Sequence, residues 1–334
     1  MQICYLIAFP DSDENKAPAS EQFKVLKDAP YFQPIDIDLL SLGEETIVIE
    51  GYAVAVRRER YDGVVQMIEC RFDLTNPFAQ SVLQLRTKIQ TVLQSKYISE
   101  TIRQSGLFED YTVLLVQDAK PSPDQWIEKN SLAISNFIRS QREVFDKEEM
   151  NEILASRTRY SAKELTLIDW EGAVIIAPNA DYQSDVILLK IGNYQLLRYR
   201  MLDESIEKML DKIKEIFFQD KSRLHPTSDV VRQIAEHKLE VMIDFERAEQ
   251  NLLLIGDWYS AKLYEAIQSE LYLRDWKENL RSKMDNLESI VATIRDNFSL
   301  SLERFWGRFE MAIYMIMLFG YLYLFFADMG WIGP

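Results

Sequence analysis

Chemically reactive side chains are few in this sequence, and they form no recognised catalytic motif. The cysteines Cys4 and Cys70 lie far apart and belong to no C-x-x-C or Cys/His cluster. The sequence therefore predicts neither a disulfide framework nor a structural zinc site, and it favours a reducing compartment. The two histidines, His225 and His237, are too few for a histidine metal cluster. We expect no catalytic residue and no metal site.

Pairs of acidic residues are the remaining candidates for cation binding, because carboxylate oxygens are ligands of hard divalent cations. The pairs are Asp36 and Asp38, Glu44 and Glu45, and Glu148 and Glu149. Such pairs are common in an acidic chain, so we assign them no site. The glycine-rich phosphate loop, the dinucleotide-binding motif and the G-x-S-x-G elbow are absent from the sequence. We therefore expect no cofactor and no enzymatic activity.

Composition narrows the class of protein further. The chain has 334 residues, of which 47% are hydrophobic, and this is ample for a packed core and for two structural units. Its 53 acidic and 38 basic residues give a formal charge of −15. This charge disfavours broad binding to nucleic acid through the folded domain. The apolar segment from Met1 to Pro10 lacks a basic flank, so it is read as a buried strand and not as a signal peptide.

Residues 1–222 are expected to form an α+β domain, a mixed sheet with helices, in which two subdomains are an open alternative. Strand-like runs are expected at 1–10, 46–50, 53–56, 111–116, 165–170, 172–177, 185–192 and 195–199. Helical spacing of apolar residues predicts helices over 77–97, 122–138 and 202–218. The polar segment 147–161 has weaker periodicity and receives no assignment.

Residues 227–308 are expected to form a long helical stalk, either a hairpin or a coiled coil. No proline follows Pro226 before Pro334, and Gly256-Asp257 is the expected corner between two helices. Apolar residues then recur at steps of four and three, which is typical of a coiled-coil seam. They are Leu280, Met284, Leu287, Val291, Ile294, Phe298 and Phe305. This seam fits packing within one chain and self-association about equally, and the two can coexist.

Residues 309–332 are expected to form one transmembrane helix. Met311 to Ala327 carries no charge, and its seventeen residues extend over roughly 25 Å at about 1.5 Å per residue. The alternative is a buried core helix or a peptide docked in a groove. The residues expected at the membrane boundary are Arg304, Trp306, Arg308, Glu310 and Trp331. Arginines before the run, with none after it, place the large N-terminal domain on the cytoplasmic or organelle-matrix side of a single-pass anchor.

The C-terminal half resembles the DUF155 family, which includes the required-for-meiotic-nuclear-division proteins. The resemblance covers about Leu165 to Phe326, and its nearest match is Arg308 to Tyr314, which is similar to that family's Arg-x-Glu at the membrane entrance. Shorter matches lie at 169–176, 238–246, 263–265 and 294–298. The resemblance implies a membrane-anchored organiser without known enzymatic activity. In architecture the chain is also similar to CorA-type magnesium channels, although it lacks their Gly-Met-Asn signature.

These patterns favour a non-enzymatic, homo-oligomeric, membrane-anchored scaffold or sensor, in which a helical stalk clusters the folded domains at a bilayer. An oligomeric pore or CorA-like cation channel, gated by a ring of folded domains, is the alternative. A membrane-tethered enzyme is a third hypothesis, supported by the acidic pairs alone. The expected partners are lipid, further copies of the chain and an unidentified protein, but not nucleic acid.

Overall fold

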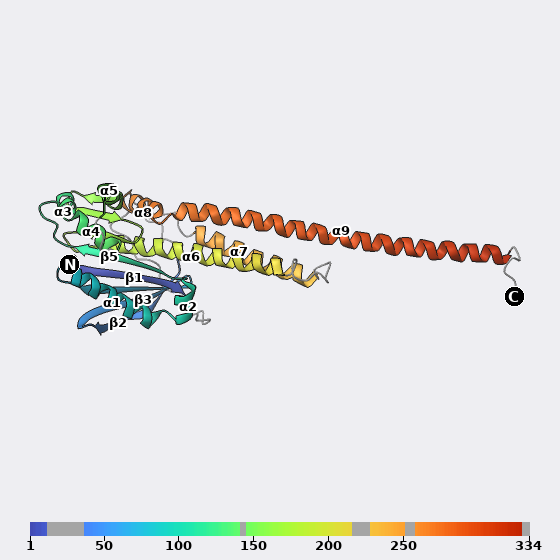
Figure 1. The fold of residues 1–334 in the computed structure, drawn as a ribbon, viewed down its shortest axis with the longest axis horizontal. Coiled ribbons are helices and arrows are strands. Elements are labelled where there is room, and N and C mark those ends of the chain that lie inside the picture. Colours follow the sequence, from blue (N-terminus) through green and yellow to red (C-terminus); the bar gives the residue numbers. More distant parts are fainter. Residues whose placement is uncertain (12–36, 141–144, 216–227, 251–257, 329–334) are drawn as a thin grey trace. The chain divides into compact units, whose positions relative to one another are not determined.

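The structure, a computed structural model, describes residues 1–11, 37–140, 145–215, 228–250 and 258–328 (Figure 1). The chain divides into two compact units. The first unit comprises Met1–Glu204 and Ile243–Leu280, and the second comprises Ser205–Met242 and Arg281–Pro334. Each unit is described by itself below.

An eight-stranded mixed sheet forms the centre of the first unit, within the described residues. Its strands are β1 (Gln2–Pro10), β2 (Leu39–Ile49), β3 (Tyr52–Tyr61), β4 (Val65–Asp73), β5 (Glu109–Val116), β6 (Arg157–Ser161), β7 (Glu164–Ile168) and β8 (Gly172–Ile176). They lie side by side in the order β2-β3-β4-β1-β5-β8-β7-β6. β5 and β8 pair in parallel, whereas the other neighbours are antiparallel. The central position of β1 explains why its residues 3–9 are all buried.

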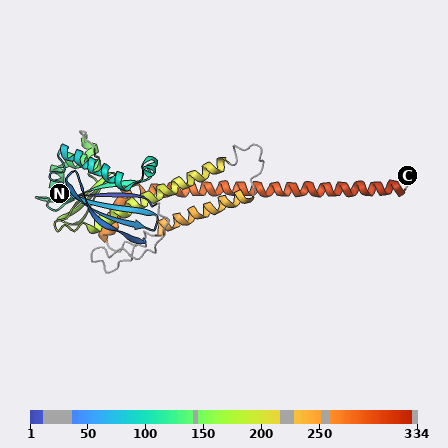
Figure 2. The same ribbon diagram turned by 90° about the horizontal axis from the view of Figure 1, so that it is seen from below.

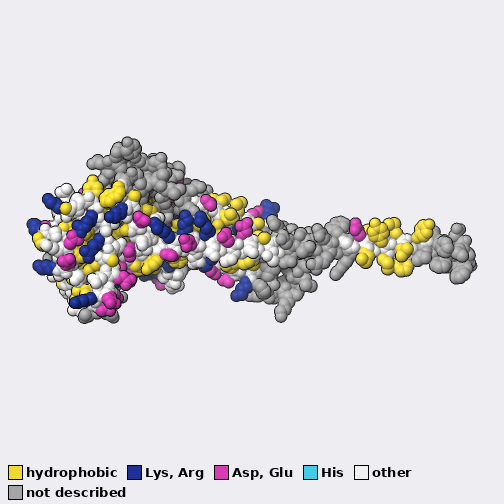
Figure 3. All heavy atoms as spheres, turned by 90° about the horizontal axis from the view of Figure 1, so that it is seen from above, with side chains coloured by type: hydrophobic (Ala, Val, Ile, Leu, Met, Phe, Trp, Pro, Cys, Tyr) yellow, Lys and Arg dark blue, Asp and Glu magenta, His cyan; other side chains and the backbone are white. Residues whose placement is uncertain are grey.

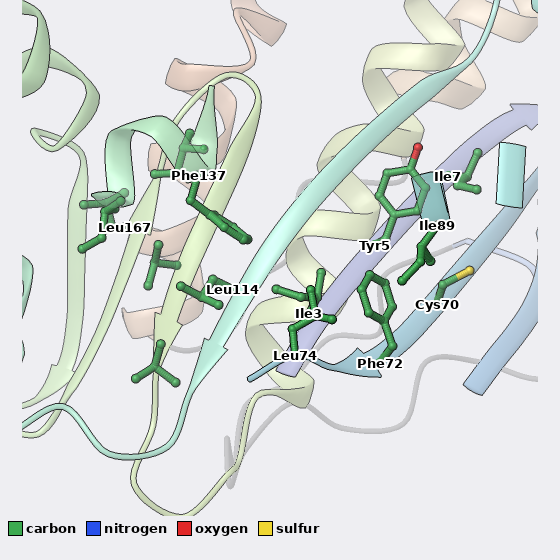
Figure 4. Packing of buried hydrophobic residues seen from close by; sticks show 14 of the residues in the cluster. Ile3, Tyr5, Ile7, Cys70, Phe72, Leu74, Ile89, Leu114, Phe137 and Leu167 are labelled. Carbon is green, nitrogen blue, oxygen red and sulfur yellow. The ribbon is translucent and has the colours of Figure 1, made fainter. Parts of the chain in front are cut away.

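Helices cover both faces of this sheet. They are α1 (Gln80–Tyr97), α2 (Glu100–Ser105), α3 (Pro123–Lys129), α4 (Ser131–Ile138), α5 (Lys147–Ile153), the first part of α6 (Gln183–Lys214), and α8 (Trp258–Glu270). Alternate residues of β1, including Ile3, Tyr5 and Ile7, share an apolar core with Ile89 of α1 (Figure 4). The opposite face meets α6, because Lys190 of that helix contacts strand carboxylates (Figure 2).

Most of the predicted elements of the first unit are confirmed. The strands at 1–10, 46–50, 53–56, 111–116, 165–170 and 172–177 correspond to β1, β2, β3, β5, β7 and β8, and the helix over 77–97 corresponds to α1. The helix over 122–138 is divided into α3 and α4 at Asn130. The segment without an assignment contains α5 and β6.

The strands predicted at 185–192 and 195–199 are wrong, because both segments lie within the helix α6. Every residue from Ser184 to Tyr199 is buried. A helix that is covered on all sides loses its polar face, so its sequence shows no 3.6-residue period and resembles a buried strand. The helix predicted over 202–218 is the continuation of α6, which is described as helix to Lys214.

The second unit contains the end of α6, most of α7 (Ser228–Gln250) and most of α9 (Leu273–Asp328). The predicted corner at Gly256-Asp257 lies outside the described residues. The long helix expected after it is interrupted between α8 and α9, where Tyr272 adopts a positive φ of 49°. Within the described part of the chain, no helix combines the length and the apolar character required to cross a membrane.

Candidate functional site

The predicted seam lies along α9, and its first residues are covered within one chain. Leu280 is fully buried and Leu287 is 1% exposed, whereas Met284 and Val291 are half-buried. The side chains of Ile294, Phe298 and Phe305 lie outside the described ones. Burial of the first seam residues in a single chain fits the within-chain alternative for this stretch, and self-association through the seam stays a prediction.

Two ion pairs flank this covered part of α9 in the second unit. Lys283 Nζ lies 2.6 Å from Glu207 Oε1 of α6, and Lys238 Nζ of α7 lies 3.2 Å from Glu288 Oε1. Both glutamates are more than half exposed. Pairs of this kind orient neighbouring helices, but each contributes little to stability in water. The packing of this part of α9 therefore depends mainly on apolar residues such as Leu287.

Beyond the seam, α9 presents an uncovered apolar surface. Every described side chain from Met311 to Tyr321 is exposed, and Figure 3 shows hydrophobic side chains on this part of the helix. Ile316 is 72% exposed and Tyr321 is 76% exposed. Glu310, predicted at the membrane boundary, is also exposed, whereas the side chains of Arg304, Trp306 and Arg308 and the whole of Trp331 lie outside the described parts. We define the residues 311–321 as the apolar segment of α9.

A network of buried charges lies between α6 and the sheet, and the sequence reasoning missed it. The Lys190 ammonium is 2.7 Å from Glu59 Oε2 on β3 and 3.0 Å from Glu69 Oε2 on β4. Arg71 donates from Nε to Glu69 Oε1 at 2.6 Å, and the Tyr61 hydroxyl donates to Glu59 at 3.2 Å. The side chain of Lys190 is only 1% exposed. These residues form what we call the Lys190 network.

The Lys190 network favours the charged forms of Lys190 and Glu69. Burial alone lowers the pKa of Lys190, but Tyr61, Glu69 and Glu59 outweigh burial and raise it above its ordinary value. Burial likewise raises the pKa of Glu69, but Lys190 and Arg71 outweigh burial and lower it. A buried lysine shared by two carboxylates at this spacing is a structural clamp, because both carboxylates compensate its desolvation.

An open groove lies beside this network, over β2, β3 and β4. It has a volume of about 360 Å³, and Glu44, Arg57, Arg71 and Gln183 are among the residues that line it. Arg57 donates from Nε to Glu44 at 2.7 Å, so the charges at its surface compensate each other. The acidic pair Glu44 and Glu45 does not act together, because Glu45 instead accepts from Lys96 and Tyr97 of α1.

The other residues considered for chemistry are dispersed. Cys4 and Cys70 lie on neighbouring strands but point to opposite faces of the sheet, since Cys70 pairs with Tyr5. Both are buried, and burial raises the pKa of the Cys4 thiol to about 12. Asp146 is the N-cap residue of α5, and its Oδ1 accepts a hydrogen bond from the backbone N–H of Glu149 at 2.8 Å. Among the described residues, no three histidine, cysteine, aspartate or glutamate side chains are grouped so as to hold a metal ion.

Comparison with known proteins identifies the family. Residues 13–183, about half of the chain, match the family described as "Uncharacterized protein MJ0711, N-terminal domain". The chain belongs to this family. It is also 25% identical over 255 residues to the uncharacterized protein MJ0711 of Methanocaldococcus jannaschii, a match that covers 76% of this chain and 77% of that protein. No solved structure matches the chain.

This membership corrects the resemblance inferred from the sequence. The family model matches residues 13–183, and the match to MJ0711 covers 76% of the chain, whereas the resemblance to the DUF155 family rested on residues 165–326 and was wrong. The likeness to CorA-type channels is set aside for the same reason. Short matches in helices, such as Arg308 to Tyr314, misled because charged residues before an apolar helical run recur in unrelated proteins.

Proposed function

We propose that this protein is a non-enzymatic scaffold or sensor that α9 tethers to a lipid bilayer. The observation that carries the proposal is the apolar segment of α9, in which eleven consecutive described residues are uncharged and exposed. Burying a large apolar side chain contributes about 1.5–3 kcal/mol, so transfer of this segment into lipid is favourable by more than 10 kcal/mol in rough terms. A segment left in water would forgo that free energy.

The sequence around the segment supports insertion. The eleven described residues extend over only about 16 Å, but the uncharged run continues in sequence to Ala327 and then extends over about 25 Å. That length approaches the hydrocarbon thickness of a bilayer, roughly 30 Å. Arg304 and Arg308 precede the run, and Trp306 lies between them, which is the composition of an interfacial boundary. The arginines favour a cytoplasmic or matrix location for the α+β domain.

Self-association is the second part of the proposal. The later seam residues Ile294, Phe298 and Phe305 continue the apolar repeat beyond Leu287. Copies of the chain confined to one membrane meet at high effective concentration, so even a weak seam would cluster the α+β domains. Light scattering on the detergent-solubilised full chain measures the outcome. A dimer or trimer supports clustering, a monomer refutes it, and a large ring would favour the alternative of a pore.

Flotation with liposomes tests the tether. The full chain is reconstituted with vesicles, and its distribution in a density gradient is compared with that of a variant carrying Ile316→Asp and Leu318→Asp. Each aspartate near the centre of an inserted helix costs about 3–4 kcal/mol relative to the apolar residue, so the variant should leave the vesicle fraction. The matched control carries Ser282→Asp and Asn286→Asp, at exposed positions of the same helix.

The wild-type chain and the control should float with the vesicles, and they should resist extraction with alkaline carbonate. The proposal fails if the wild-type chain remains with the soluble fraction. It also fails if the Ile316→Asp, Leu318→Asp variant floats as the control does, because the apolar segment would then not be the element that contacts lipid.

A further inference from the structure

A second cavity lies in the first unit, at the N-terminal ends of the parallel strands β5 and β8. Its volume is about 220 Å³. This greatly exceeds the roughly 10–15 Å³ needed to hold one water molecule, yet it is smaller than the pockets of drug-sized ligands. The lining residues used below are Glu109, Asp110, Trp170, Glu171 and Asn193. We call it the β5–β8 cavity.

The β5–β8 cavity is lined by three carboxylates and by no lysine or arginine. Glu109 forms an ion pair with Arg200. Asp110 accepts a hydrogen bond from the Tyr5 hydroxyl at 2.8 Å, and it forms no ion pair with the described residues. The carboxylate of Glu171 makes no hydrogen bond or ion pair with the described residues. Asp110 and Glu171 are both exposed, and they line this cavity without an ion pair among the described residues.

The electrostatics of these carboxylates agree with that description. Neighbouring protein atoms partly remove the exposed Asp110 carboxyl from water and raise its pKa above its ordinary value, and the hydrogen bonds from Tyr5 and Gln94 offset this only in part. The same partial desolvation raises the pKa of Glu171, and the charges of Asp169 and Asp110 add to the effect, while Arg139 opposes it. A cation bound among these groups would stabilise their charged forms.

Two further residues suit an organic cation. Trp170 lines the cavity and lies 5.6 Å from the ring of Tyr272, and an indole face attracts ammonium groups. Asn193 is 3% exposed, and its Nδ2 donates to the Leu189 carbonyl at 2.8 Å. Its Oδ1 makes no hydrogen bond with the described residues, although the side chain is buried and lines the cavity. This oxygen is an acceptor available to a ligand that donates hydrogen bonds.

The arrangement suits an ammonium group better than a metal ion. Metal binding needs oxygen ligands that converge on one point, and the described acidic residues form no such group. An ammonium group carries three donors and can use acceptors that are spread around a cavity. We propose that the β5–β8 cavity binds a small aliphatic amine, with Asp110, Glu171 and Asn193 as acceptors and Trp170 as the aromatic contact.

Titration calorimetry of the full chain in detergent with putrescine, a diamine, tests this site. We expect saturable binding of one putrescine per chain, and the substitutions Asp110→Asn and Glu171→Gln should each weaken it by roughly tenfold or more, which corresponds to about 1.4 kcal/mol. Glu128→Gln removes an exposed charge that does not line the cavity and is the matched control. It should bind as the wild-type chain does.

Magnesium chloride at equal ionic strength separates a built site from general attraction to an acidic protein. Putrescine should remain bound in its presence, because the site recognises hydrogen-bond donors as well as charge. The inference is overturned if no saturable binding is measured, if magnesium displaces putrescine completely, or if Asp110→Asn and Glu171→Gln bind as tightly as Glu128→Gln. Membrane flotation should be normal in all three variants, so failure here is distinguishable from failure of the tether.

Discussion

Replacing Lys190 with methionine would test the Lys190 network most directly. Methionine has a similar length but no charge, so the substitution mainly removes the cation shared by Glu59 and Glu69. Those two glutamates are 8% and 5% exposed, and water cannot easily replace the missing ammonium. Removing one partner of a buried ion pair typically costs about 3–5 kcal/mol, and we expect Lys190→Met to lower the free energy of unfolding by this amount at neutral pH.

The pH dependence of the stability that Glu69 contributes should also change sign in this variant. In the wild-type protein, Glu69 has a folded-state pKa below its ordinary value of 4.5. A carboxyl of this kind stabilises the fold above its unfolded-state pKa, and this stabilisation is lost as the pH falls through the folded-state pKa. Without Lys190, burial dominates and should raise the pKa of Glu69. The variant should therefore become more stable as the pH falls from 7 towards about 5, where the wild-type protein gains nothing from this group.

Urea unfolding monitored by circular dichroism, at pH 7 and at pH 5, measures both effects. The matched control is Lys96→Met, which removes a lysine that is 41% exposed and pairs with Glu45 at the surface. Its urea midpoint should change much less than that of Lys190→Met. If the two variants are equally stable at pH 7, or if Lys190→Met is not relatively stabilised at pH 5, the account of the network as a buried clamp is refuted.

Three other substitutions test the packing of the first unit. Gly192→Ala should destabilise the domain by about 1–3 kcal/mol in thermal unfolding, because the added Cβ would lie 2.4 Å from Ile267 Cγ2 of α8. Ala53→Gly, on the exposed part of β3, is a control for general glycine effects. If Gly192→Ala is as stable as the wild-type protein, α8 is displaced easily. Tyr259→Phe should cost about 1–2 kcal/mol, since its hydroxyl donates to buried Asp185 at 2.8 Å. Tyr52→Phe, at an exposed site of β3, is the control and should be neutral. Cys4→Ser should have a lower urea midpoint than Cys4→Ala, because burial disfavours the serine hydroxyl. A higher midpoint for Cys4→Ser would contradict the buried position of this side chain.

Sequence reasoning predicted the strands better than the long helix that covers them. β1, β3 and β5 were recognisable because short apolar runs lie between turn residues such as Gly51 and Gly63. The first half of α6 was misread because burial on every side removed its polar face. A helix and a strand differ in backbone hydrogen bonding, and a short apolar run such as Val186 to Leu189 shows no periodicity that separates them.

The Lys190 network left a signal in the sequence that could have been used. Lys190 is a single charge within the apolar run 186–191, and a lysine in such a run requires a buried partner. Glu69 lies between the apolar residues Ile68 and Cys70 of β4, whereas Glu59 lies between Arg58 and Arg60 of β3. What the sequence could not provide was the pairing, because the register that brings β3 and β4 together under α6 depends on the whole sheet. The β5–β8 cavity was unpredictable for the same reason, as its lining comes from six separate stretches of the chain.

The position of α6 indicates how the α+β domain would respond to a ligand. Its residue Asn193 lines the β5–β8 cavity, and Lys190, one turn earlier, is fixed to β3 and β4. Sliding this part of α6 along the sheet would break both ion pairs of Lys190, and breaking a buried ion pair is strongly destabilising. A ligand in the cavity is therefore expected to act on a rigid sheet and helix. By mass action it should raise the unfolding temperature of the domain progressively as the ligand concentration exceeds the dissociation constant, and it should leave the helix and strand content unchanged.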